Sequence, residues 1–282
     1  METFVLLGER FETPPAEILA PLLGETLGLV PYEALRAAAS ARGILAEGLE
    51  KEQAERIAGG LGAAGFPCRV VPGRVAPPAG PVRAAREVRL LEEGLRFRPG
   101  FTGPWISLPW EGLLLLSAGV ILEMEGGGFR STGKKGGGSV GLGGAARLVV
   151  DPVGGALSIL KKTRKKGGLE RRPGVPFPHP LADLYFQGAG EGTGWIRVRA
   201  REVSFPGLRE EGEKGNFYRD FLAFLEEADR RSRGASLTAP ARSLLGEGPE
   251  GIPLEGEAFF GEEEAFRRYN RWALACVLSG RP

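Results

Sequence analysis

The segment ILAEGLEKEQAERIAGGLGAAGFPCRVV, residues 44–71, decides the first fold of this chain. Its central part, residues 50–64, repeats apolar residues along one helical face and is followed by Gly65, a residue type that commonly ends helices. The apolar runs on either side, residues 44–49 and 68–71, are short enough to be strands. The segment therefore predicts a strand, a helix and a strand in that order.

Residues 1–72 are expected to fold as β-α-α-β-α-β, because the residues before this segment predict one more strand and two more helices. Residues 4–7 are a short apolar run ended by a glycine, which is typical of a buried strand. A pair of prolines then suits the first turn of a helix that runs to Gly28. A second helix is expected from about Pro31 to Gly43. Its apolar residues are Ala34, Leu35 and Ala38.

Five short motifs lie in this region: Leu27-Gly28-Leu29, Glu33-Ala34, Ala46-Glu47-Gly48-Leu49, Glu52-Gln53-Ala54 and Ala64-Gly65. In identity, order and spacing, residues 3–71 resemble the C-terminal domain of the bacterial ribosomal stalk protein. That family binds translation factors through lysines on its helices, whereas residues 32–38 of this chain carry only Arg36 as a cation. The resemblance implies the family's fold and an adaptor role, without the binding of translation factors.

A proline-rich stretch marks the expected end of this first domain. Residues 72–86 contain four prolines and two glycines with few large apolar side chains, a composition typical of linkers. The length of 282 residues also exceeds that of one typical domain. We therefore expect a first domain at residues 1–72, a linker at residues 73–86 and a second domain at residues 87–282.

The second domain is predicted to be rich in strands and to end in helices. Seven runs read as strands between glycine or proline turns, at residues 95–98, 105–108, 112–124, 146–150, 156–160, 181–187 and 195–203. Asn216 can cap a following helix with an aromatic stripe that includes Phe217 and Phe221. This plan resembles the pleckstrin-homology-like fold, in which such a helix closes an open barrel end. With a last helix at residues 262–278, the whole chain is expected to be α+β, a small α/β domain followed by a β-barrel or sandwich.

Composition excludes several kinds of site and segment. A single histidine, His179, and two distant cysteines, Cys68 and Cys276, leave no Cys/His zinc site and no disulfide framework. The start of the chain lacks the basic segment of a signal peptide. The longest apolar run, residues 112–122, is too short to span a membrane. We therefore expect a cytoplasmic protein with no transmembrane segment and no metal.

Residues 128–135, GFRSTGKK, approach the pattern of a phosphate-binding loop. Such a loop needs Ser or Thr after its lysine to hold magnesium, and a helix N-terminus behind it. Lys135 stands where the Ser or Thr should be, and three glycines follow where the helix would begin. Ten of residues 126–144 are glycine, which favours a long hairpin loop. No nucleotide or other cofactor is expected.

Two basic features supply the candidate binding residues. Residues 161–172 carry seven cations and one acid, enough for phosphate contacts with nucleic acid or acidic lipid headgroups. In the strand at residues 195–203, Ile196, Val198 and Ala200 are expected to face inward and three arginines outward. The plainer interpretations are a solvated loop and an edge strand guarded by charge. The candidate anion-binding residues are Lys161, Lys162, Arg164, Lys165, Lys166, Arg171, Arg172, Arg197, Arg199 and Arg201.

The sequence favours interaction over catalysis. Net charge is −4 in residues 1–72, +9 in residues 73–204 and −3 in residues 205–282, a basic middle between acidic ends. We expect a non-catalytic, two-domain adaptor with a protein partner. The alternative is a protein that binds nucleic acid or an acidic membrane surface through the basic residues above. A hydrolase that uses Asp151 and Asp183 ranks last, because no motif supports it.

Overall fold

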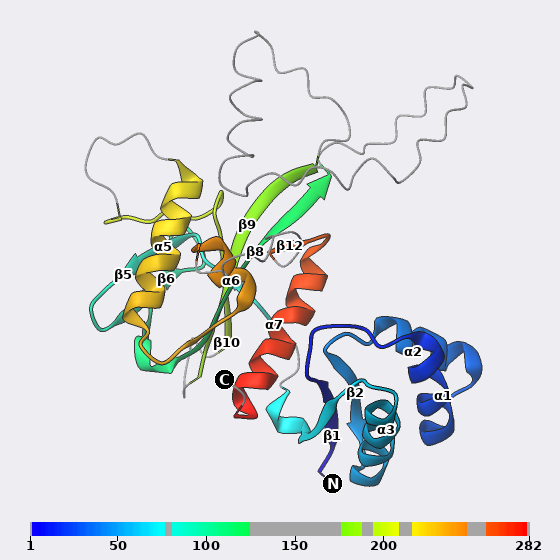
Figure 1. Cartoon of the computed structure of the whole chain (residues 1–282). Coiled ribbons are helices and arrows are strands. Elements are labelled where there is room, and N and C mark those ends of the chain that lie inside the picture. Colours follow the sequence, from blue (N-terminus) through cyan, green and yellow to red (C-terminus); the bar gives the residue numbers. More distant parts are fainter. Residues whose placement is uncertain are drawn as a thin grey trace, which may run out of the picture.

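The computed structural model describes residues 2–76, 81–124, 176–187, 194–208, 216–246 and 258–280. The expected α+β class is confirmed: the described part of the chain contains three sheets and several helices. Figure 1 shows a small helix-covered sheet beside a larger strand-rich part, with one helix between them.

The N-terminal unit, residues 2–76, has the expected β-α-α-β-α-β order. Its elements are β1 (Phe4–Gly8), α1 (Ala16–Leu27), α2 (Pro31–Ser40), β2 (Ile44–Leu49), α3 (Lys51–Ala63) and β3 (Cys68–Pro72). The sheet has the order β2-β1-β3, with β1 antiparallel to both neighbours. A capping box begins α3, in which the Glu50 side chain accepts from the first helical turn and Gln53 accepts from the Glu50 backbone. The three helices cover one face of the sheet, where Leu6, Leu23 and Ile57 share a core.

The three apolar residues named for the second helix differ in burial. Ala34 and Ala38 of α2 are buried, whereas Leu35 is 51% exposed. Small residues make the contact between α1 and α2, since a Cβ added at Gly24 would lie 3.8 Å from the Ala34 Cβ. Leu35, the next residue after Ala34, points about a quarter turn away from that contact and so reaches solvent.

The rest of the chain forms a large sheet and a small sheet. Its strands are β4 (Arg83–Ala84), β5 (Glu87–Leu90), β6 (Gly94–Arg98), β7 (Ile106–Pro109), β8 (Leu113–Met124), β9 (Pro176–Phe186), β10 (Gly194–Arg199), β11 (Ser236–Leu237) and β12 (Phe259–Phe260). Its helices are α5 (Phe217–Arg231), α6 (Ala239–Leu244) and α7 (Glu263–Leu278). The large sheet has the order β11-β8-β9-β10-β4, with β12 beside β8, and the small sheet has the order β5-β6-β7.

These two sheets and α5 share one core. Phe97 of β6, Phe186 of β9 and Phe224 of α5 are all buried in it. The Asn216 side chain accepts a hydrogen bond of 3.0 Å from the Tyr218 backbone, which confirms the expected helix cap. The expected strands at 146–150 and 156–160 lie outside the described residues. Within the described ones no closed barrel is found, and the strand expected at 195–203 ends at Arg199.

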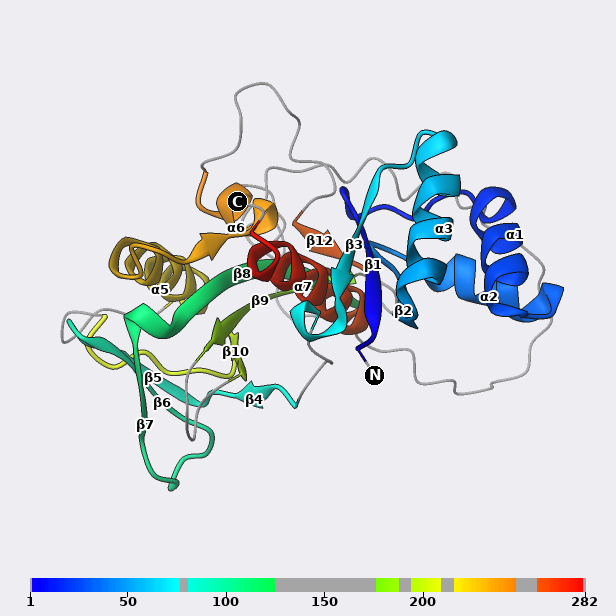
Figure 2. The same ribbon diagram turned by 90° about the horizontal axis from the view of Figure 1, so that it is seen from below.

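Helix α7 lies between the large sheet and the sheet of the N-terminal unit (Figures 1 and 2). On one side, Phe266 and Leu274 pack against β8 and β9. On the other side, Ala275 and Cys276 pack against Val5 and other apolar residues of β1 and β3. Strand β1 is therefore covered on both faces, which explains its unbroken apolar sequence.

Polar contacts add to this apolar contact of α7 with the N-terminal unit. Trp272 donates a hydrogen bond of 3.0 Å from Nε1 to the backbone oxygen of Gly8. Arg271 pairs with both carboxylate oxygens of Glu47 at 2.5 and 2.7 Å. Two parts of the expected linker, residues 73–86, are described. Ala76 is buried beside α7, and β4 pairs with β10. Both parts are therefore packed against folded structure.

We predict that Gly43→Ala will destabilise the chain more than Gly48→Ala. Both glycines have positive φ, 70° and 71°, so both substitutions cost the same backbone strain. A Cβ at Gly43 would also lie 2.6 Å from Phe11 and 2.7 Å from Trp272, whereas a Cβ at Gly48 meets nothing within 4 Å. Urea denaturation should show an additional loss of about 1–3 kcal/mol for Gly43→Ala. Equal losses for the two variants would contradict the placement of α7 against this turn.

Candidate functional site

The basic run predicted as a binding site lies outside the described residues. All seven of its cations are among the residues that the structure does not describe: Lys161, Lys162, Arg164, Lys165, Lys166, Arg171 and Arg172. The three arginines of the second basic feature, Arg197, Arg199 and Arg201, are described.

These three arginines do not form the exposed face that the sequence predicts. Ile196, Val198 and Ala200 are buried as expected, but Arg197 is also buried, with 2% of its surface exposed. The reason is that α7 lies over the arginine side of β10, so both faces of this strand are covered. Arg201 follows the strand in a turn, where its guanidinium carbon lies 5.1 Å from the Phe217 ring centre.

Arg197 forms a buried ion pair with Asp183, its direct neighbour across the antiparallel β9–β10 pair. Its Nε and Nη2 atoms donate to the two carboxylate oxygens at 2.7 and 2.6 Å. Burial by itself lowers the pKa of Arg197, but the hydrogen bonds and negative charges of Asp183 and Glu263 outweigh it and raise the pKa. The Arg197 side chain is therefore charged at any working pH. Its two hydrogen bonds to Asp183 have the bidentate geometry that guanidinium and carboxylate groups prefer.

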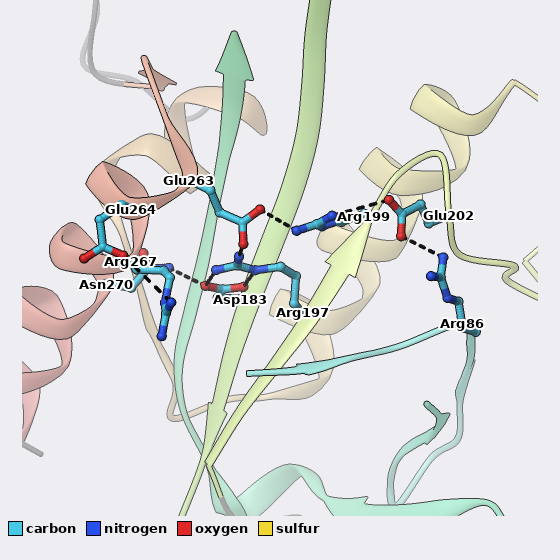
Figure 3. A network of polar contacts seen from close by, with 9 residues as sticks. All are labelled: Arg86, Asp183, Arg197, Arg199, Glu202, Glu263, Glu264, Arg267 and Asn270. Carbon is cyan, nitrogen blue, oxygen red and sulfur yellow. Dashed lines mark hydrogen bonds and ion pairs between the residues drawn. The ribbon is translucent and has the colours of Figure 1, made fainter. Parts of the chain in front are cut away.

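Glu263, in the first turn of α7, connects this pair to the surface (Figure 3). It accepts from Nη1 of Arg197 and from Nη2 of Arg199. Arg199 also reaches Glu202 at 3.4 Å, and Glu202 pairs with Arg86 at 2.7 Å. Arg199 is thus held between two carboxylates of the same chain.

Asn270 of α7 extends the same set of contacts into the core. Its Nδ2 atom donates to Asp183 at 2.8 Å, and its Oδ1 atom accepts from the Ser117 hydroxyl at 2.6 Å. The Thr238 hydroxyl, just before α6, donates to Ser117 at 3.2 Å. We call this set the polar joint; its members are Ser117, Asp183, Arg197, Thr238, Glu263 and Asn270.

The polar joint is suited to holding elements together. Both oxygens of Asp183 already accept hydrogen bonds, from Arg197 and Asn270, so neither is open to a substrate. Asp151, the other acid of the hydrolase hypothesis, lies outside the described residues. Within the described ranges, no group of three or more His, Cys, Asp or Glu side chains could hold a metal ion. Two signals pointed to the joint in the sequence: an acid within the apolar strand 181–187, and an asparagine on the apolar side of the last helix.

A second feature, which sequence reasoning missed, is an exposed apolar surface at the start of α2. Val30 is 56% exposed, Tyr32 74% and Leu35 51%. With the exposed Ala39, they form a patch that we call the α2 surface. Tyr32, Leu35 and Ala39 have the spacing of one helical face, which lies about a third of a turn from the face of Ala34 and Ala38. The helix lies on the far side of the N-terminal unit from α7 (Figure 1).

We predict that Asp183→Asn will strongly destabilise the chain, because it removes the buried carboxylate that pairs with Arg197 and leaves the partly exposed Glu263 to match this charge. Loss of one partner of a buried pair costs about 3–5 kcal/mol. The matched control is Glu264→Gln, whose carboxylate pairs with the partly exposed Arg267 and Arg268 at 3.8 and 3.4 Å. That change should cost about 0–1 kcal/mol. Urea denaturation of both variants measures the difference, and similar losses would contradict the importance of the buried pair.

Comparison of this chain with protein-family models, with curated proteins and with solved structures finds no match. The likenesses to the ribosomal stalk domain and to pleckstrin-homology-like domains therefore remain resemblances of sequence pattern. Among the described helices, none is long and apolar enough to cross a membrane. Function has to be inferred from the surfaces and contacts of the chain itself.

Proposed function

We propose that this chain is a non-catalytic adaptor that binds a protein partner through the α2 surface. The observation that carries the proposal is the exposure of Val30, Tyr32 and Leu35 within six residues of sequence. Large apolar side chains that gather on a surface mark interaction sites more often than scattered ones do. Tyrosine is also enriched at the centres of protein interfaces, where it contributes much of the binding energy.

The position of the α2 surface supports the same proposal. The sheet behind α1 and α2 is fixed on its other face by α7, so the α2 surface belongs to a rigid scaffold. A helix face that is already ordered pays little conformational entropy when a partner binds. The side chains of Tyr32, Leu35 and Ala39 can therefore contact an apolar helix or groove of another protein without rearrangement.

Charge indicates the kind of partner. The first 72 residues carry a net charge of −4, and Glu33 lies exposed beside the α2 surface. A partner with an apolar contact face and basic residues around it would complement both features. Helix α2 itself carries one cation, Arg36, so it contributes little positive charge that would repel such a partner.

The alternative function, binding of nucleic acid or acidic lipid through the predicted basic residues, has less support from the contacts. Arg197 and Arg199 are engaged by Asp183, Glu263 and Glu202. This alternative depends mainly on residues 161–172. Protein binding is favoured because the apolar side chains of the α2 surface are exposed, whereas Arg197 and Arg199 are paired within the chain.

The test is affinity capture of partners with the Tyr32→Ser/Leu35→Ser variant. The expected result is a loss of at least about tenfold in the amount of a specific partner, because truncation at the centre of an interface removes most of its energy. The matched control is Phe217→Ser, which changes a side chain that is 38% exposed at the start of α5. Both variants should melt close to the wild-type temperature, since all three side chains are exposed. A partner that the double variant retains in full would contradict the proposal.

A further inference from the structure

The outward side of the small sheet has an unusual composition. Its inward side chains, including Val88, Leu95 and Phe97, are buried in the core. Since side chains alternate along strands, the others face outward. We call this outward side the sheet platform; it consists of Glu87 and Arg89 of β5, Arg96 and Arg98 of β6, and Trp105 and Ser107 at the start of β7.

The strand register places two arginines of the platform directly opposite each other. Arg89 pairs with Arg96 across the antiparallel β5–β6 ladder, and both are exposed. Like charges in this position repel each other and destabilise a sheet. Arg96 donates to the Ser107 hydroxyl at 2.8 Å, and no described carboxylate pairs with it. Arg89 has Glu87 at 3.5 Å, the outer limit of a hydrogen bond. An anion between the two guanidinium groups would relieve their repulsion.

The ring of Trp105 lies next to two arginines of the platform, Arg89 and Arg98. The guanidinium carbons of Arg89 and Arg98 lie 4.6 and 5.1 Å from the ring centre of the half-buried Trp105. Phe101, in the same β6–β7 connection, is 75% exposed. The platform therefore offers flat apolar and guanidinium surfaces close to a site for negative charge.

The nearby acids leave this positive charge in place. Glu87 is the one acid of the platform, and it is bound by Arg98. Glu92 and Glu93 are exposed at the tip of the β5–β6 hairpin, beyond the last pair of the ladder. Two arginines opposite one another, with a tryptophan ring beside Arg89, suit a ligand that carries both phosphates and flat rings.

We propose that the sheet platform binds single-stranded nucleic acid. Its phosphates would lie at Arg89 and Arg96, and its bases would stack on the exposed Phe101 and on the guanidinium groups that lie over Trp105. Guanidinium groups bind phosphate and also stack on rings, and aromatic residues in a basic groove are typical of such sites. A duplex buries the faces of its bases and a lipid bilayer offers no rings, so both fit the platform less well. This site shares no residue with the α2 surface or with the basic run at 161–172.

The test uses the full chain and fluorescently labelled oligo(U) and oligo(dT) of about 12 nucleotides, a length that single-strand sites cover. Binding is measured by anisotropy at about 50 and about 200 mM salt. The test variant is Arg89→Gln/Arg96→Gln, and its matched control is Arg233→Gln/Arg242→Gln, two exposed arginines of the same part of the chain. A third variant, Trp105→Ala, tests stacking. In a fourth, Lys161, Lys162, Arg164, Lys165 and Lys166 are changed to Ser.

The proposal predicts that Arg89→Gln/Arg96→Gln weakens binding by about tenfold or more at low salt. It should also reduce the slope of log affinity against log salt by about 1.4, the value for two phosphates of a single strand. Trp105→Ala should weaken binding about tenfold through lost stacking, and the control pair should bind like wild type. Because the arginine variant loses a repulsion, it should melt at or above the wild-type temperature. Comparison of oligo(U) with oligo(dT) distinguishes RNA from DNA as the ligand.

Four results would overturn the proposal. The first is no binding of either oligonucleotide at low salt, and the second is an equal loss of affinity in the arginine variant and its control. The third is a loss of affinity only in the fourth variant, with its changes at residues 161–166. The last is tighter binding of the wild-type chain to duplex DNA or to acidic vesicles than to single strands. Partner capture through the α2 surface does not depend on any of these results.

Discussion

The arrangement of the described part of the chain depends on the buried ion pair between Arg197 and Asp183. An arginine at 2% exposure is tolerated only where its charge is matched, and here Asp183 and Glu263 match it. Glu263 and Asn270 both belong to α7, so the same contacts that satisfy Arg197 hold this helix on the large sheet. The opposite side of α7 then becomes the surface on which the N-terminal unit packs.

This arrangement determines which surfaces remain for partners. In the described part of the chain, helices pack on both faces of the N-terminal sheet and of the large sheet, so neither the α2 surface nor the sheet platform lies on a face that α7 covers. The α2 surface and the sheet platform lie at opposite ends of the structure in both views (Figures 1 and 2). With α7 between them, a protein at one end and a nucleic acid at the other could be bound at the same time and held in a fixed relative position.

Local pattern predicted many of the elements, but not β4, β5, β11, β12 or α6, and the contacts between distant segments were not visible in it. The N-terminal order, the cap at Asn216 and the apolar side of the last helix follow from spacing and turn residues, and the structure confirms them. The exposure of Leu35 could not be predicted, because apolar type alone does not show which helical face packs. Arg197 was placed on the surface because the helix that covers it is supplied 66 residues later, at Glu263. The hydrogen bond from Trp272 to Gly8 spans 264 residues, and no local signal predicts such a contact.

The central claim is that α7 joins the N-terminal unit and the large sheet into one cooperative body. Native-state hydrogen exchange of the Asp183→Asn variant tests it most directly, because Asp183 belongs to the large sheet and the readout is in β1 and β3. The account predicts that amides of β1 and β3 lose protection together with those of α7, since a loosened α7 exposes Val5, Leu7 and Val71. Unchanged protection in β1 and β3, with loss confined to α7 and β9, would contradict it.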